Sequence, residues 1–211
     1  MGKTESQLTD NFYVNVELVA SRELRELVKK LQNSLNLHEK TDYLPGTSDC
    51  PVHLTLYSTY SSMTAISEMI HVLESISNRF KPISLEIGES GCFADGSIVL
   101  NCERVTPLIL LHEEIVSGLN PLRDITEPPE EFAVELSDEQ IGRFREIGDP
   151  FALQTYRPHV TIARVGSYQR AKKLSESLPI VRRKVTFSRL AARIWLSENS
   201  TASKLFECIL Q

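Results

Sequence analysis

The chain has 211 residues, of which 41% are apolar, 24% charged and 7% aromatic, so it can form one sizeable hydrophobic core. Its nine glycines and ten prolines exclude collagen-like and low-complexity chains. No apolar run approaches the ~18 residues that a membrane-spanning helix needs, so we expect no membrane association. The four cysteines are not closely spaced and residues 1–12 lack the apolar stretch of a signal peptide, which predicts reduced thiols in a cytoplasmic protein.

The formal net charge of −5 is unevenly distributed along the chain. Residues 124–149 carry nine acidic and two basic side chains, whereas residues 157–193 carry ten basic side chains and one acidic one. Local clusters rather than the net charge decide which ligands approach a surface, so a polyanionic ligand is not excluded. Arg182 and Lys184 alternate within the basic segment and are compatible either with a surface that follows RNA or with an edge strand protected by charge.

Apolar periodicity predicts intermixed helices and strands in the first part of the chain. Residues 106–107 (Thr-Pro) suit the N-cap and first position of a helix. The expected elements are, in chain order, a strand at 12–19, a helix at 21–35, a polar loop at 36–51, a strand at 52–57, a helix at 66–80, strands at 83–87 and 97–102, and a helix at 106–119.

An acidic, proline-containing segment at about 120–156 follows, which we interpret as an insertion or a flap. Within it, Ser137 and Gln140 form a capping box for a short helix that ends at Gly148. The remaining expected elements are a strand at 159–165, a helix at 168–178, and strands at 180–187, 190–196 and 204–210. This order predicts an α+β fold with mainly antiparallel pairing, and we expect residues 1–211 to form a single domain.

Two histidines occur in the same local pattern, His-x-Thr followed by an apolar residue, within strands. The first copy is His53 and Thr55 in VHLTL, and the second is His159 and Thr161 in HVTIA. Residues i and i+2 of a strand point to one face, so each motif presents an imidazole and a hydroxyl together while the intervening apolar residues enter the core. Two such strands facing each other across a cleft would offer two imidazoles and two hydroxyls to one small anion.

This set of groups suits phosphodiester chemistry. One neutral imidazole can take a proton from an attacking water while the opposite imidazolium donates a proton to the leaving oxygen. The threonine hydroxyls can hold nonbridging phosphate oxygens as charge builds up. No metal or cofactor is required, and no cluster of carboxylates surrounds the histidines in the sequence.

The paired motifs, about a hundred residues apart, resemble those of the two-histidine (2H) phosphoesterase superfamily, and RPHVTIAR resembles the second motif of its 2′-5′ RNA ligase-like, cyclic phosphodiesterase branch. The resemblance covers roughly residues 12–119 and 157–210. It implies two pseudo-symmetric lobes around a central cleft, with helices on the outer faces. It also implies metal-independent cleavage of 2′,3′-cyclic phosphates, 2′-5′ linkages or related cyclic phosphates, with His53 and His159 as the acid/base pair and Thr55 and Thr161 as phosphate-binding residues.

Other residues near the motifs are candidates for substrate binding. Tyr57 is expected to share the face of His53 and Thr55, so it could stack on a base or pack at the rim. Tyr156 and Arg157 directly precede the second motif and could contact base or phosphate. Arg164 is expected on the opposite face from His159 if the strand is regular. Tyr13, Asn15 and Glu17 share one side of the first strand, and the sequence does not distinguish among them.

Two other classes of function compete with the hydrolase. A noncatalytic RNA- or nucleotide-binding module could use the same cleft for recognition alone. Alternatively, the histidines could be structural metal ligands, in which case the purified protein would contain stoichiometric zinc. The preferred interpretation is a monomeric, metal-independent phosphodiesterase that acts on a nucleotide or short RNA, and neither the natural substrate nor the acid and base roles follow from the sequence.

Overall fold

The computed structural model describes residues 11–35, 41–47, 50–195 and 202–211. Parts of the loop expected at 36–51 and the last residue of the strand expected at 190–196 lie outside these ranges. The elements in chain order are β1 (Asn11–Val19), α1 (Arg22–Ser34), β2 (His53–Ser62), α2 (Met63–Ser77), β3 (Ile83–Cys92), β4 (Ser97–Cys102), α3 (Thr106–Leu119), η1 (Asn120–Leu122), α4 (Glu130–Ala133), α5 (Asp138–Ile147), η2 (Leu153–Thr155), β5 (His159–Arg164), α6 (Tyr168–Ser177), β6 (Arg183–Phe187), β7 (Arg189–Trp195) and β8 (Ala202–Ile209).

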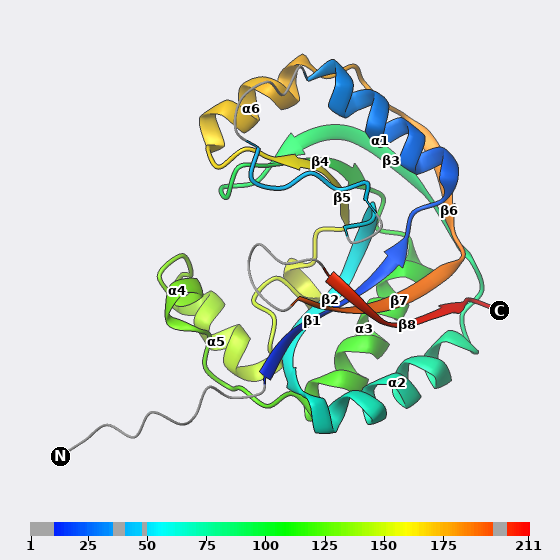
Figure 1. Ribbon diagram of the computed structural model, residues 1–211, viewed down its shortest axis with the longest axis vertical. Helices are drawn as coiled ribbons and strands as arrows, with labels where there is room; N and C mark the ends of the chain where they lie inside the picture. Colours follow the sequence, from blue (N-terminus) through cyan, green and yellow to red (C-terminus); the bar gives the residue numbers. More distant parts are fainter. Residues whose placement is uncertain (1–10, 36–40, 48–49, 196–201) are drawn as a thin grey trace.

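The eight strands form one curved sheet in the order β6-β3-β4-β5-β2-β1-β7-β8, and each neighbouring pair is antiparallel (Figure 1). The sheet has two four-stranded halves that meet at β5 and β2. These two strands share only one register pair, Leu54 with Val160, so the halves diverge on either side of it. The sheet therefore places the two His-x-Thr strands next to each other at its centre.

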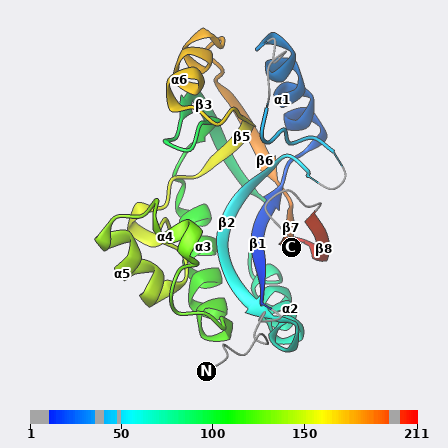
Figure 2. The same ribbon diagram turned by 60° about the vertical axis from the view of Figure 1, so that its left-hand side comes forward.

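Helices cover the two halves separately, as Figure 2 shows. Helices α1 and α6 pack on the half that contains β3, β4 and β5, and α2 and α3 pack on the half that contains β2 and β8. Apolar residues from these helices and from the sheet form one continuous core. The predicted α+β class and its two-lobed arrangement are confirmed. No helix within the described part of the chain combines the length and the apolar character needed to cross a bilayer.

The boundaries of some elements differ from the expectation. Strand β2 continues to Ser62, because β1 pairs with it along its whole length and so supports a polar stretch that lacks apolar alternation. Helix α3 begins at Thr106 with Val105 as its N-cap, so Thr106 is not the cap that we expected. The capping box of Ser137 and Gln140 on α5 is present as predicted, and that helix ends at Gly148 with a left-handed backbone.

The acidic segment covers the edge of β2 from which β5 diverges. Backbone groups along this edge bond to the segment: the Tyr156 hydroxyl donates to Thr55 O at 2.8 Å, Asp149 Oδ2 accepts from Ser58 N at 3.3 Å, and Asp124 N donates to Tyr60 O at 3.2 Å. A strand edge exposes unpaired donors and acceptors unless another segment covers it. Residues 120–156 thus supply part of the support for the strand that carries the first motif.

Part of the basic segment is engaged within the fold. Strand β6 lies at one end of the sheet, so its position is that of an edge strand. Arg182, which directly precedes β6, is 3.9 Å from Glu89. In β7, Arg189 pairs with Glu207 at 2.7 Å and Arg193 is buried. Part of this positive charge therefore stabilises the sheet.

Candidate active site

The two motifs lie on neighbouring antiparallel strands of one sheet, which corrects the expectation of two strands facing each other across a cleft. Leu54 and Val160 pair directly and are fully buried, so both enter the core on one face. The antiparallel pairing at Leu54 and Val160 sets each motif histidine on the side of the threonine of the other motif. The four side chains gathered on the opposite face are His53, Thr55, His159 and Thr161.

Both imidazoles are oriented by the same local hydrogen bond. His53 Nδ1 lies 2.8 Å from Pro51 O, and His159 Nδ1 lies 2.7 Å from Arg157 O. A carbonyl oxygen only accepts, so each ring carries its proton on Nδ1 and donates it to the carbonyl two residues earlier. This tautomer leaves Nε2 of both rings as the nitrogen that can exchange a proton with a ligand.

A bulge follows the threonine of each motif and changes which residues face the site. The register shifts leave Leu56 without a partner on β1 and Ile162 without a partner on β4. Beyond each bulge the alternation is reversed. The expectation that Tyr57 shares the site face is therefore wrong. The expectation that Arg164 points away from the site assumed a regular strand, and the bulge turns Arg164 to the site face instead.

The residues that the bulges bring to the site face are Ser58 and Arg164. Tyr57 is instead fully buried, and its hydroxyl donates to Ile147 O at 2.5 Å. Arg164 remains part-exposed, with its guanidinium 4.0 Å from Asp95 and 5.9 Å from the centre of the Tyr43 ring. A sequence pattern based on strict period 2 cannot show this exchange.

Side chains from the covering helices hold both bulges. His112 Nδ1 on α3 donates to Leu56 O at 2.5 Å, and Gln32 Nε2 on α1 donates to Ile162 O at 2.9 Å. His112 Nε2 also accepts from Leu153 N at 2.8 Å, which fixes a neutral imidazole with both nitrogens bonded. His112 is therefore a structural histidine whose ring is buried in the core.

His112 gives the protein a predictable sensitivity to acid. Burial lowers the pKa of His112 to about 4, whereas an unfolded histidine titrates near 6.5. Stability from this group is complete above about pH 6.5 and is lost as the pH falls toward 4, by up to about 3 kcal/mol. We expect His112→Gln to flatten the dependence of the unfolding free energy on pH in this range, measured by urea unfolding. Burial raises the pKa of Asp149 to about 6, so the contribution of this carboxyl group to the unfolding free energy increases as the pH falls. Asp149 is present in both the wild type and His112→Gln, so it does not affect the comparison.

The two residues before the second motif lie in different surroundings. Tyr156 is buried, its ring stacks on His112 with centroids 3.9 Å apart, and its hydroxyl bonds to Thr55 O. It therefore supports the first motif from behind rather than offering a face to a base, which corrects the expected contact. Arg157 is exposed, and its carbonyl orients His159, so substrate contact by its side chain stays a prediction.

The surroundings of His159 favour its neutral form. Burial lowers the pKa of His159 below the ordinary value for histidine, and the charge of His53 lowers it further. The Phe93 ring meets the imidazole edge to face at a centroid distance of 4.7 Å, which restrains its orientation.

A buried polar network that sequence reasoning did not single out lies beside His53. Glu17 is fully buried on β1, and its Oε2 lies 3.6 Å from His53 Nδ1. Its carboxylate accepts from Arg193 Nε at 2.7 Å and from Asn15 Nδ2 at 3.0 Å. The alternation of β1 already placed Asn15 and Glu17 together, but their burial became evident only once β7 was known to supply Arg193.

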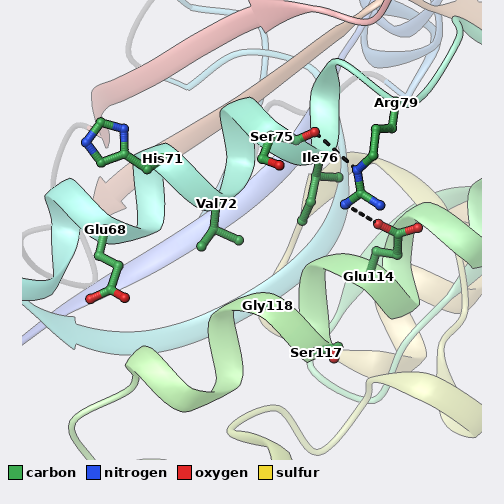
Figure 3. A pocket seen from close by; sticks show the side chains of 9 residues that line it. All are labelled: Glu68, His71, Val72, Ser75, Ile76, Arg79, Glu114, Ser117 and Gly118. Atoms are coloured by element: carbon green, nitrogen blue, oxygen red, sulfur yellow. Dashed lines mark hydrogen bonds and ion pairs between the residues drawn. The ribbon is translucent and has the colours of Figure 1, made fainter.

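A separate hollow of about 520 Å³ lies between α2 and α3, as Figure 3 shows. His71, Arg79 and Glu114 are among its lining residues, and none of those residues belongs to either motif. We therefore do not assign the phosphate site to this hollow, because the histidines and threonines that suit phosphodiester chemistry lie on another part of the molecule. Within the described ranges, no three His, Cys, Asp or Glu side chains are grouped so that they could hold a metal ion.

The fold and the site together define the class of protein. Its members have a curved antiparallel sheet with two adjacent strands at the centre that each carry a His-x-Thr motif. The family model described as the 2′-5′ RNA ligase superfamily matches residues 20–196. The chain belongs to this superfamily, and the suggested relationship to the 2H phosphoesterases is confirmed. Membership supports a phosphoesterase-type enzyme.

Solved structures with the same fold have low sequence identity to this chain. TT0787 of Thermus thermophilus superposes with a TM-score of 0.61 at 15% identity, covering 94% of this chain and 97% of that one. Escherichia coli LigT in apo form gives 0.57 at 13% identity, covering 96% and 99%. LigT complexed with 3′-AMP gives 0.57 at 14% identity, covering 95% and 98%. A comparison with curated protein sequences gave no match.

Proposed function

We propose that the protein is a metal-independent phosphodiesterase that hydrolyses 2′,3′-cyclic phosphates, 2′-5′ linkages or related cyclic nucleotide phosphates. The observation that carries this proposal is the register of β2 and β5, which puts each histidine opposite the threonine of the other motif on one face. Both imidazoles present Nε2 to that face through matching backbone hydrogen bonds. A phosphate centred between the motifs would meet two proton-transfer groups and two hydroxyl donors.

The proposed reaction of a 2′,3′-cyclic phosphate uses these groups without a covalent intermediate. One neutral imidazole accepts a proton at Nε2 from the water that attacks phosphorus. The bond between phosphorus and one ribose oxygen breaks, and the second imidazolium donates its Nε2 proton to that oxygen. Thr55 and Thr161 donate hydrogen bonds to the nonbridging oxygens, where negative charge increases in the transition state.

Nucleotide ligands of similar proteins support this class of substrate. LigT of Escherichia coli has been crystallised with 3′-AMP, and separately with phosphate. A 3′-monophosphate is one of the two products that opening of a 2′,3′-cyclic phosphate can release. We therefore expect a nucleotide or a short RNA to be the substrate of this chain.

The test is turnover of a substrate panel with a metal chelator present throughout. The panel contains 2′,3′-cyclic nucleotides, 2′-5′ oligonucleotides and ADP-ribose cyclic phosphate, with products separated by chromatography. We expect multiple turnovers of at least one cyclic phosphate. Tight binding of nucleotides without turnover of any compound would instead identify a noncatalytic binding module. Activity that disappears with chelator and returns with zinc would favour the metal-ligand alternative.

A further inference from the structure

Glu17 is placed by the sheet register beside the proposed acid/base pair. It pairs with Thr55 across β1 and β2, and a residue and its register partner point to the same face. The side chain is fully buried, yet its Oε2 lies 3.6 Å from Nδ1 of His53. An ionised carboxylate at this distance stabilises an imidazolium more than a neutral imidazole.

The carboxylate is held in a fixed orientation by one partner from the neighbouring strand β7 and one from its own strand β1. Arg193 of β7 donates to Oε1 at 2.7 Å, and Asn15 donates to Oε2 at 3.0 Å. Asn15 is fixed in turn, because Ser58 Oγ donates to its Oδ1 at 2.9 Å. Ser58 faces this network only because of the bulge at Leu56, so the same irregularity that removes Tyr57 from the site completes the support of Glu17.

Other charged or titratable groups surround this network. Arg193 on β7 pairs directly with Glu17. In addition to burial, the charge of Glu17 raises the pKa of both Cys50 and Tyr43, and the charge of Arg193 lowers that of Cys50. On the opposite side, His159 is influenced by His53 and by Asp95. The anionic partner that contacts His53 within the described residues is Glu17, whereas His159 has Phe93 against its ring. The two imidazoles are therefore electrostatically unequal.

We propose that Glu17 is a positioning residue whose carboxylate, fixed by Arg193 and Asn15, stabilises the imidazolium form of His53, so that His53 acts as the proton donor and His159 as the proton acceptor. This inference rests on the proposed phosphodiesterase function. In the hydrolysis of a cyclic phosphate, His159 Nε2 takes the proton of the attacking water and His53 Nε2 gives a proton to the departing ribose oxygen. Solvent then restores both rings to their starting protonation states, and Glu17 itself exchanges no proton.

The first test compares the pH dependence of kcat/KM for the wild type, Glu17→Gln and Glu207→Gln. Loss of a proton donor forms the alkaline limb of such a profile, and protonation of the acceptor forms the acidic limb. We expect Glu17→Gln to move the alkaline limb to lower pH by about one unit, with a loss of kcat/KM that approaches about tenfold above the wild-type midpoint. The acidic limb should not move. A shift of the acidic limb alone, or of neither limb, would overturn the proposal.

Glu207→Gln is the matched control, because it also removes a carboxylate that pairs with an arginine of β7. Glu207 lies on β8 and accepts from Arg189 at 2.7 Å, away from both motifs. We expect this variant to keep both limbs of the wild-type profile. If it shifted the alkaline limb as Glu17→Gln does, the effect would reflect general charge loss and the specific role of Glu17 would be rejected.

The second test does not depend on hydrolysis. NMR titration of the His53 ring, assigned with a His53→Gln sample, follows its protonation in the substrate-free protein. We expect Glu17→Gln to move the titration midpoint of this ring to lower pH. Should Glu17→Gln leave Arg193 unpaired and fail to fold, Glu17→Gln/Arg193→Met removes both charges, and a smaller shift in the same direction is expected. An unchanged midpoint refutes the inference; a shifted midpoint in a protein without turnover refutes only the proposed function.

Discussion

Alanine at either motif histidine is expected to lower kcat/KM for the best 2′,3′-cyclic phosphate by about 10²–10⁴-fold, the usual contribution of a positioned acid or base. Each single variant removes one partner of a proton-transfer pair, so His53→Ala/His159→Ala should lose little more than either single variant. The measurement is the initial rate at saturating and limiting substrate with chelator present. Circular dichroism and thermal unfolding establish that the variants keep the fold.

His71→Ala is the control for these variants. His71 lies on α2, largely exposed, with its ring 3.5 Å from Glu74 and no contact with either motif. Its replacement should leave the rate unchanged. Wild-type rates in both His53→Ala and His159→Ala would contradict the proposed acid/base pair, since no other described histidine lies on that face of the sheet.

Valine at Thr55 or Thr161 is expected to have the next largest effect on catalysis. Valine keeps the shape and strand preference of threonine but removes the hydroxyl donor, so the loss isolates the hydrogen bond to phosphate. Removal of one preorganised donor to a developing oxyanion lowers kcat by about 10²–10³-fold. Steady-state kinetics should show this loss mainly in kcat, because the bond strengthens as charge builds up.

Thr186→Val provides the matched control for the threonine variants. Thr186 is an exposed residue of the edge strand β6, where its hydroxyl bonds to Ser84 at 2.7 Å. This variant should retain the wild-type kcat. If Thr55→Val and Thr161→Val raised KM and left kcat unchanged, the hydroxyls would contribute ground-state binding alone and the proposed stabilisation of the transition state would be wrong.

The two motifs could be found in the sequence because their chemistry follows from strand period. His53 and Thr55 share a face for the same reason as His159 and Thr161, and the apolar residues between them anchor both strands in the core. The helices were predictable from their apolar stripes, and α3 has the predicted end at Leu119. What the periodicity could not show was that the two strands would become neighbours, because this pairing joins residues about a hundred positions apart.

The remaining errors trace to the bulges. One extra residue at Leu56 turns Tyr57 into the core, and one at Ile162 turns Arg164 toward the site. Nothing in the local composition distinguishes these positions from regular strand. Their stability comes from tertiary partners, Gln32 and His112, which donate to the carbonyls of the bulged residues.

Burial of Glu17 likewise depends on tertiary structure. An acidic residue that alternates with apolar ones in a strand normally faces solvent. Here the pairing of β1 with β7 brings Arg193 to the carboxylate, and the bulge in β2 brings Ser58 to Asn15. The charge of a sequence segment therefore does not show whether its residues lie on the surface or in the site. Arg193 belongs to the basic segment, yet it lies in the interior.

The most direct test of the account is a crystal structure of the protein with a nucleoside 3′-monophosphate bound. We expect one phosphate on the face shared by β2 and β5, within hydrogen-bond distance of Nε2 of both motif histidines and of both threonine hydroxyls. A phosphate bound by one motif alone, or a nucleotide seated in the hollow between α2 and α3, would contradict it.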